Sequence, residues 1–313
     1  MSLLTVDNLS VEFADGRRPV EDVTFSVREG ESVAVVGESG CGKTITALAV
    51  MELLPDQARI VHGNVAIHGF SEKMSALRGK VISMVFQDPM TSLNPVIPVG
   101  WQIAEMYQVH ERAGSRAARR KAMTLLERVG IPDPDRAFRM HQHQFSGGMR
   151  QRAIIAMAIA LRPKLLIADE PTTALDVTVQ AQILELLIDL RRETGMTTIL
   201  ITHDLGVVAA MADTVLLMYA GRVMERASVD SFYLQPRHPY GRALLRAVPR
   251  IEVDGTPRAP IAGAPPNLDA LPAGCRFHPR CIYAVDRCRT ESPELRVVGE
   301  GLVACHLAER LDA

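Results

Sequence analysis

Hydrophobic and polar residues alternate along the start of the chain. The alternation is clearest at residues 3–6, 10–13 and 23–27, and residues 14–16 and 28–30 supply turn formers. A period of two is typical of strands that bury one face. The segment therefore predicts a small antiparallel sheet.

A nearly continuous apolar run at residues 32–36 has a different pattern. It leads into glycine-rich residues 37–42, after which residues 45–54 have helical spacing that stops at Pro55. A run of this kind predicts a buried strand. The order of strand, glycine loop and helix is also the context in which phosphate-binding loops occur.

Helical spacing dominates residues 98–161, and apolar runs then alternate with helical patterns. The runs are 164–168, 197–202 and 215–219, and the helical patterns are 177–194 and 205–211. Such alternation is typical of a mostly parallel sheet with helices on both faces. We therefore predict an α/β fold with a helical subdomain at about 98–161.

The last quarter of the chain has a different composition. Residues 236–313 hold ten of the nineteen prolines, and no helical period extends beyond 242–247. A loop-rich module of this size buries little core of its own and would gain stability from an added cross-link. We predict one domain at 1–235 and an extension at 236–313.

Composition and charge exclude several classes of protein. The 313 residues suffice for about two domains, and 47% are hydrophobic with a net charge of −1. This balance argues against nucleic acid as the main partner, because such binding needs excess Lys and Arg. The dense basic run predicts a solvated helix face, with a surface near anionic lipid as the alternative. Its members are Arg112, Arg116, Arg119, Arg120 and Lys121.

Membrane and secretion signals are not found in the sequence. No run reaches the roughly eighteen apolar residues of a membrane helix, and residues 1–13 lack the pattern of a signal peptide. We expect a cytoplasmic chain that touches a membrane only through a partner.

Residues 37–44 match the P-loop pattern. In such a loop, backbone N–H groups point at the phosphates, the lysine (Lys43) reaches the β- and γ-phosphate oxygens, and Thr44 holds Mg²⁺. The motif predicts binding of ATP or GTP. The predicted nucleotide-binding residues are Gly37, Glu38, Ser39, Gly40, Cys41, Gly42, Lys43 and Thr44.

Chemically active side chains follow two later apolar runs. Asp169 and Glu170 come after residues 164–168, and His203 comes after 197–202. Nucleotide sites of open α/β sheets lie at such strand ends. We expect Asp169 to hold Mg²⁺ or its water, and Glu170 to deprotonate the attacking water. His203 would bond the γ-phosphate or that water, with a purely structural role as its alternative.

A second phosphate site is predicted at Ser146-Gly147-Gly148, just before a helix that starts near Met149. Its N–H groups, hydroxyl and helix dipole suit an anion. A simple helix cap is the alternative. Two half-sites in one chain imply a dimer in which each nucleotide lies between one chain's P-loop and the other's Ser-Gly-Gly loop.

These motifs, in this order, resemble the nucleotide-binding subunit of an ATP-binding cassette (ABC) transporter over about residues 1–235. The resemblance implies an ATPase in which Phe13 stacks on adenine, with a place in the strand core as the alternative. It also implies that Gln87 of the Q-loop holds Mg²⁺ with Thr44. Asp176 would belong to the D-loop at residues 173–176.

The same resemblance makes Ser146, Gly147, Gly148 and Met149 the signature that faces a partner's nucleotide. The chain departs from the family pattern at Phe145, Met149 and Cys41, where Leu, Gln and Ser are commoner. None of these changes removes a group needed for hydrolysis. With Glu170 present, the chain's own site is expected to be competent.

Longer segments around these motifs resemble the ATPases of oligopeptide, dipeptide and nickel importers. Among the two ATPase subunits of such importers, the chain is more similar to the first. The segments are 86–95, 146–152, 170–177, 238–240 and 274–281. The resemblance implies a second ATPase subunit, identical or not, two permeases and an extracytoplasmic binding protein. Nickel or another small solute is an alternative cargo, and a soluble ABC ATPase of DNA repair or translation is a more distant one.

Four of the five cysteines lie near the end of the chain, at Cys275, Cys281, Cys288 and Cys305. In a reducing compartment such a group favours metal over disulfides. Four thiolates suit Zn²⁺ or an iron–sulfur cluster. The family resemblance favours a [4Fe–4S] cluster, with Zn²⁺ or merely reduced thiols as alternatives.

Overall fold

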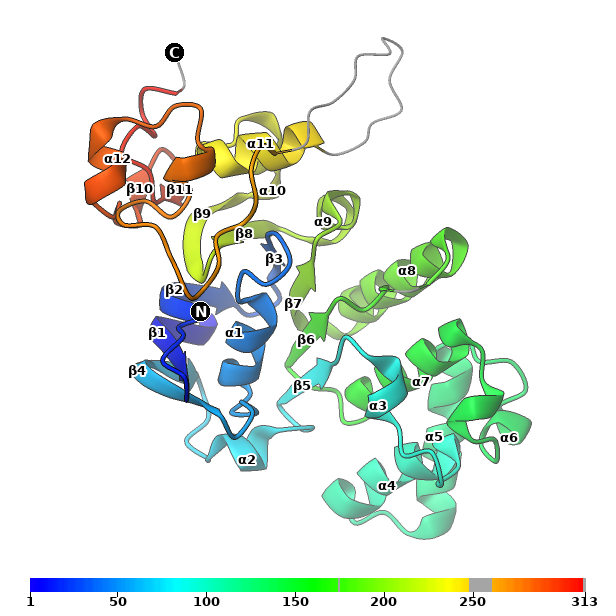
Figure 1. The fold of residues 1–313 in the computed structure, drawn as a ribbon. Coiled ribbons are helices and arrows are strands. Elements are labelled where there is room, and N and C mark those ends of the chain that lie inside the picture. The colour runs from blue at the N-terminus through cyan, green and yellow to red at the C-terminus, as the bar shows by residue number, and fades with distance from the viewer. Residues whose placement is uncertain (174, 248–260, 312–313) are drawn as a thin grey trace, which may run out of the picture. The chain divides into compact units, whose positions relative to one another are not determined.

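The computed structural model describes residues 1–173, 175–247 and 261–311. By internal packing the chain forms two compact units (Figure 1). The first comprises residues Met1–Gly69 and Ile201–Ala313, and the second comprises Phe70–Leu200.

A three-stranded antiparallel sheet opens the first unit. The central strand β1 (Ser2–Phe13) pairs with β2 (Val20–Arg28) on one side and with β4 (Ala58–Ile67) on the other. The predicted antiparallel sheet is confirmed, but the two short strands expected at 3–6 and 10–13 are one long strand. Its pairing with β2 is irregular between Val6 and Val11.

The fully buried strand β3 (Ser32–Val36) occupies the predicted apolar run. It leads through the glycine loop into helix α1 (Lys43–Val50). Strand β3 pairs in parallel with β8 (Thr214–Tyr219), which in turn pairs antiparallel with β9 (Arg222–Ser228). The glycine loop is therefore anchored on a buried strand.

The C-terminal region extends this sheet. Strand β11 (Gly301–Val303) pairs antiparallel with both β9 and β10 (Arg296–Val298). The sheet is thus mixed, and the expectation of a mostly parallel sheet missed these strands. Besides α1, the helices in the described part of the unit are α9 (Leu205–Met211), α10 (Val229–Leu234), α11 (Pro239–Ala247), η2 (His278–Arg280) and α12 (Asp286–Thr290).

The core of the first unit includes residues of the C-terminal region. Cys275 and Phe277 belong to the same buried cluster as Val36, Leu217 and Tyr240. The extension therefore packs on the sheet and does not depend on an isolated core, because its apolar side chains complete one that is already present.

The second unit holds the parallel pair β5 (Ile82–Val85) and β6 (Leu165–Asp169). Strand β7 (Thr197–Thr202) crosses from this unit into the first. Helices fill the segment predicted to be helical. The helices of the unit are α2 (Met74–Leu77), α3 (Pro89–Ser92), α4 (Val99–Glu111), α5 (Ser115–Arg128), α6 (Pro134–Ala137), η1 (Gln142–Gln144), α7 (Gly147–Ile159) and α8 (Val177–Thr194).

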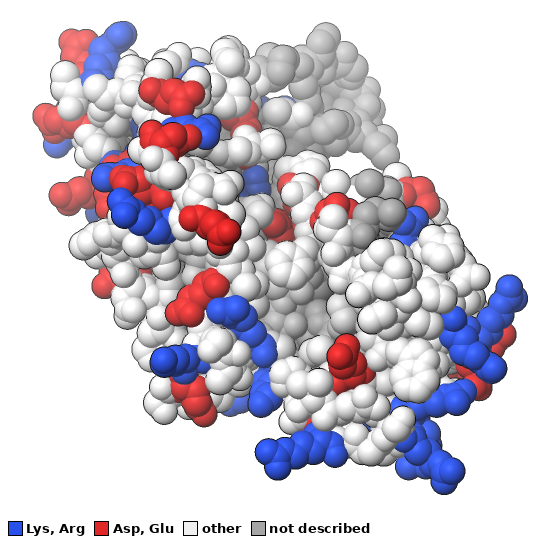
Figure 2. Space-filling model, turned by 60° about the horizontal axis from the view of Figure 1, so that its bottom comes forward, with Lys and Arg blue, Asp and Glu red and all other residues white. Residues whose placement is uncertain are grey.

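Basic side chains gather at one edge of the face drawn in Figure 2 and are interspersed with acidic ones elsewhere. On helix α5, Arg119 lies 3.7 Å from Asp135, and Lys121 pairs with Glu111. These pairings fit a solvated helix face. Within the described part of the chain, none of the helices is both long and apolar enough to cross a membrane.

Candidate functional site

Glycines shape the loop between β3 and α1. Gly37, Gly40 and Gly42 have φ angles of 154°, 77° and 101°, which residues with a side chain rarely adopt. A Cβ atom on Gly37 would lie 2.2 Å from the carbonyl oxygen of Met218, and one on Gly42 would lie 2.4 Å from that of Pro19. Both positions therefore require glycine.

Lys43 is folded back over this loop. Its Nζ donates to the carbonyl oxygens of Gly37 at 2.8 Å and of Glu38 at 3.0 Å, and the residue is only 6% exposed. No side chain caps the N-terminus of α1, where Gly42 is the cap residue. Because helix N-termini favour anions, the ammonium group and the free helix end together suit a phosphate. Thr44 follows in the first turn and is partly exposed.

Cys41 is buried beneath the loop, with its Sγ 3.7 Å from Lys43 Nζ. Burial raises the pKa of this thiol above its usual value, although the lysine opposes the shift. Cys41 is therefore neutral at pH 7 and packs like a small apolar side chain.

Two further predicted residues lie in the first unit. Phe13 ends β1, is partly exposed, and has the Arg17 guanidinium 5.7 Å from its ring centre. It is therefore not a core residue of the strand. His203 directly follows β7 and is exposed, while Asp204 caps helix α9.

In the second unit, Asp169 and Glu170 lie at the end of β6. Asp169 is 1% exposed. Glu170 has a positive φ of 45°, a conformation that is strained for a residue with a side chain. Glu170 Oε2 accepts hydrogen bonds from Gln87 Nε2 at 3.0 Å and from Thr173 Oγ1 at 2.8 Å. The structure thus joins two predicted residues and adds Thr173 of the predicted D-loop, whose contact with Glu170 the sequence did not indicate.

Ser146 caps helix α7. Its Oγ accepts a hydrogen bond from the N–H of Met149 at 3.2 Å, as in the structural alternative for this motif. The hydroxyl proton is not used in that bond. Asp176 caps α8 in the same way through the N–H of Val179. Ala174 of the predicted D-loop lies outside the described residues.

Gly148 allows helices α7 and α8 to approach closely. A Cβ atom there would lie 2.7 Å from Val179 Cγ1. We expect Gly148→Ala to lower the free energy of unfolding by about 1–3 kcal/mol, because overpacking forces neighbours apart. Adding Val179→Ala should restore part of the loss in urea unfolding. No loss in Gly148→Ala, or no recovery in the double variant, would refute this packing role.

The four C-terminal cysteines line one small cavity, together with residues that include His238 and His306. Cys275, Cys288 and Cys305 are buried, and Cys281 is half-buried. Burial raises the pKa values of Cys275, Cys281 and Cys305 to about 11. With pKa values of about 11, these three thiols are protonated at pH 7.

The structure by itself does not support a metal at these cysteines. Across residues 1–173, 175–247 and 261–311, no three His, Cys, Asp or Glu side chains lie close enough to hold a metal ion. This finding supports neither Zn²⁺ nor an iron–sulfur cluster at these cysteines.

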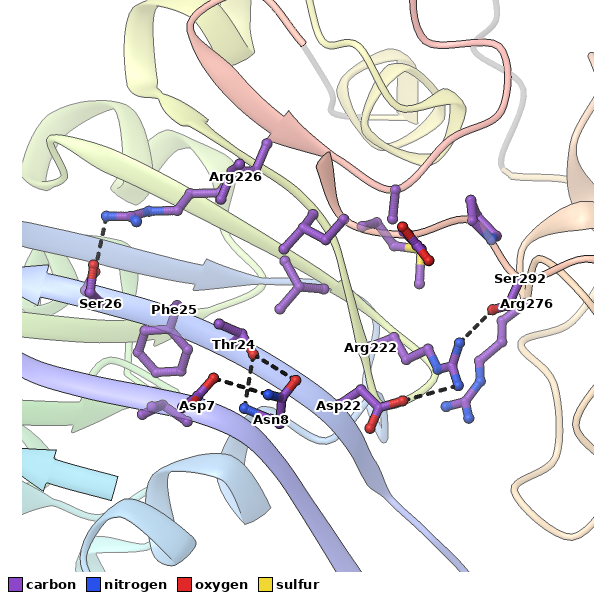
Figure 3. Close-up of a pocket in the computed structure, with 18 of the residues that line it drawn as sticks. Asp7, Asn8, Asp22, Thr24, Phe25, Ser26, Arg222, Arg226, Arg276 and Ser292 are labelled. Atoms are coloured by element: carbon purple, nitrogen blue, oxygen red, sulfur yellow. Dashed lines mark hydrogen bonds and ion pairs between the residues drawn. The ribbon is translucent and has the colours of Figure 1, made fainter. Parts of the chain in front are cut away.

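A separate cavity of about 910 Å³ lies against β1, β2 and β9 (Figure 3). Arg222 points toward Asp22, at 3.5 Å, and also bonds Ser292. Arg226 donates to the carbonyl oxygen of Ser26 at 2.9 Å. Because these arginines already have partners, the cavity offers little attraction for phosphates.

Two family models match the chain. Residues 20–173 match the model described as ABC transporter, and residues 224–288 match the oligopeptide/dipeptide transporter C-terminal region. The second match begins inside β9, the strand that carries the C-terminal strands.

Curated relatives match over nearly the whole chain. It is 48% identical to the dipeptide transport ATP-binding protein DppD of Escherichia coli (strain K12), covering 98% of this chain and 97% of the relative. It is 48% identical to the oligopeptide transport ATP-binding protein OppD of Salmonella typhimurium, covering 93% and 89%. For OppD of Mycobacterium tuberculosis the identity is 52%, over 94% of this chain and 50% of that protein.

Solved structures share the fold. One is cbiO1 from Clostridium perfringens, part of the ABC transporter complex cbiONQ, with a TM-score of 0.64 and 25% identity over 75% of this chain and 91% of the other. Another is the ATP-binding cassette MJ0796 bound to ADP and Pi, with a TM-score of 0.64 and 24% identity over 72% and 98%. The chain therefore belongs to the ABC transporter family, as an ATPase whose sequence continues into the oligopeptide/dipeptide transporter C-terminal region.

Proposed function

We propose that this chain powers the import of di- or oligopeptides by hydrolysing ATP. The observation that carries the proposal is the match to dipeptide and oligopeptide transport ATP-binding proteins over nearly the full chain. The P-loop geometry supports it, because the glycine turns, the buried lysine and the uncapped helix end together suit a bound phosphate.

The proposed roles in hydrolysis follow the chemistry of each side chain. Lys43 neutralises charge on the β- and γ-phosphates, and Glu170 accepts a proton from the attacking water. His203 hydrogen-bonds the γ-phosphate, and Phe13 stacks on adenine. The oxygen donors Thr44, Gln87 and Asp169 suit Mg²⁺, which prefers such ligands and would neutralise phosphate charge.

The hydrogen bonds of Glu170 suggest how hydrolysis is controlled. Its Oε2 is engaged by Gln87 and Thr173, and these bonds weaken its ability to take a proton. We propose that release of Gln87 frees the carboxylate for catalysis. The Q-loop would in this way link catalysis to the permeases.

The proposed assembly contains a second ATPase subunit, identical or different, in which Ser146, Gly147, Gly148 and Met149 face the partner's nucleotide. Two permeases and an extracytoplasmic binding protein complete it, and the chain lies at the cytoplasmic face of the membrane. We propose domains at residues 1–235 and 236–313, with the helical subdomain at about 98–161.

Uptake in cells tests the proposal. A strain that lacks this chain should lose ATP-dependent uptake of a labelled dipeptide and regain it from a plasmid carrying the natural sequence. A plasmid with Glu170→Gln should not restore uptake. Unchanged peptide uptake in the deletion strain would refute the proposal, and loss of nickel uptake instead would establish the alternative cargo.

We also propose that the four C-terminal cysteines hold a [4Fe–4S] cluster, since they line one cavity and cysteine thiolates are its usual ligands. Protein purified without oxygen should contain equal amounts of iron and sulfide, and Cys288→Ser should lower both. The matched control is Cys41→Ser, which changes a cysteine outside the cavity and should retain both. If protein with the natural sequence contains no iron and no sulfide, the proposal is contradicted.

A further inference from the structure

Glu38 of the P-loop is paired with an arginine of the C-terminal region. Arg280 Nη1 lies 2.6 Å from Glu38 Oε2, and Arg280 Nη2 lies 2.9 Å from Glu38 Oε1. This is a two-pronged pairing, which fixes both groups more firmly than a single contact. The Arg280 side chain is 5% exposed and that of Glu38 is 23% exposed, so water screens the pair only weakly.

Arg280 is held from several sides. Its Nε donates to the carbonyl oxygen of Ala262 at 3.0 Å, and its Nη1 donates to Tyr219 Oη at 3.2 Å. Its guanidinium carbon also lies 5.8 Å from the centre of the Tyr219 ring. The arginine is thus a fixed positive charge beside the P-loop.

The backbone of Glu38 is held by Tyr240 of helix α11. Its N–H donates to Tyr240 Oη at 2.8 Å. Tyr240 is fully buried against Tyr219 and Phe277, with ring centres 4.6 Å and 5.3 Å away. The side chain and the backbone of one P-loop residue therefore both depend on residues beyond position 238.

The charge of Glu38 poses a problem for a phosphate site. Lys43 Nζ contacts the Glu38 carbonyl oxygen at 3.0 Å, so the carboxylate belongs to the residue beside the phosphate-binding ammonium group. A bare carboxylate there would repel a triphosphate, because like charges at short range raise the free energy of the bound state. Arg280 cancels that charge.

We propose that Arg280 is a positioning residue for nucleotide binding: it neutralises Glu38, holds the P-loop in its binding shape, and so makes the C-terminal region part of the ATP site. The inference rests on the ATPase activity of the family and adds a residue from outside the nucleotide-binding motifs. Arg280 also ends helix η2 and directly precedes Cys281, so the cysteine cavity and the Glu38 contact share one short segment.

Binding of the non-hydrolysable analogue AMPPNP with Mg²⁺ to the full chain, measured by titration calorimetry, tests the proposal. Arg280→Ala should raise Kd about tenfold, because Glu38 is left with an uncompensated charge. Glu38→Gln removes the negative charge and leaves that of Arg280 uncompensated, so it should bind the analogue more tightly than the natural sequence does. The double variant should return to within about threefold of the natural Kd, because the pair acts as a unit.

Two comparisons separate charge compensation from a merely structural role. Arg287→Ala removes an exposed arginine of the same region, which pairs with Glu291, and should leave Kd unchanged. If Arg280 only supports folding, Arg280→Ala loses as much affinity with Glu38→Gln as without it, and the proposal fails. An unchanged Kd in Arg280→Ala also overturns it. Arg280→Lys, which keeps the charge, should bind more tightly than Arg280→Ala and provides the test if the alanine variant does not fold. If the protein with the natural sequence binds no nucleotide, that result contradicts the ATPase activity itself.

Discussion

Glu170→Gln is expected to bind ATP with near-natural affinity and to lose turnover by about 100-fold to 10,000-fold, the usual contribution of a general base. The amide keeps the shape of the side chain, and its oxygen can still accept the hydrogen bonds that Gln87 and Thr173 make to Glu170 Oε2. It cannot accept a proton from water. The ATPase rate and equilibrium binding of AMPPNP, measured on the same preparation, separate the two effects.

Glu185→Gln is a suitable control for this variant. Glu185 is exposed on helix α8 and lies in the same unit as Glu170. Its replacement should leave both rate and affinity unchanged. Natural turnover in Glu170→Gln would remove Glu170 from the mechanism and leave proton transfer to another group.

Lys43→Ala should weaken binding of AMPPNP with Mg²⁺ by about tenfold to 100-fold, the range expected for a lost charge-assisted hydrogen bond. The ammonium group donates hydrogen bonds to the carbonyl oxygens of Gly37 and Glu38. It must exchange these partners for phosphate oxygens, so its loss acts on the bound state more than on the fold. Titration calorimetry gives the Kd, and thermal unfolding checks the fold.

Lys80→Ala is the matched control, since Lys80 is exposed and lies outside the P-loop. It should bind the nucleotide like the natural sequence. Equal affinities in Lys43→Ala and Lys80→Ala would show that the buried ammonium group does not contact the phosphates.

The apolar runs of the sequence predict the strands that carry the site. Residues 32–36 and 197–202 coincide with β3 and β7, because buried strands leave little room for polar side chains. Helix α1 differs from its prediction, since it begins at Lys43 and ends at Val50. Glu52 has a positive φ of 50°, which ends the helix before Pro55.

Contacts between distant segments could not be predicted from the sequence. Arg280 and Glu38 are 242 positions apart, and neither residue type indicates the other. The late strands β9, β10 and β11 were missed for a related reason. The last two are three residues long and are formed because they pair with an existing sheet edge, so their own pattern is weak.

The hydrogen bond from Thr173 to Glu170 could not be predicted from the sequence either. Thr173 belongs to a segment whose sequence suggests the D-loop, and its hydroxyl reaches Glu170 Oε2 at 2.8 Å because the chain turns sharply at the positive φ of Glu170. A strained backbone at one residue leaves no periodic signal in the sequence. The sequence motif predicts a catalytic role for Glu170, but it does not indicate the hydrogen bonds that restrain the side chain.

The most direct measurement is ATP hydrolysis by the complex recovered with a tagged copy of this chain from its native membrane and placed in liposomes with its binding protein. We expect two permeases and an ATPase partner to be recovered, and we expect a bound dipeptide to stimulate hydrolysis and to enter the liposomes. Recovery of ribosomes or nucleic acid in place of permeases, or a rate of ATP hydrolysis that does not change with bound peptide, would contradict the proposed function.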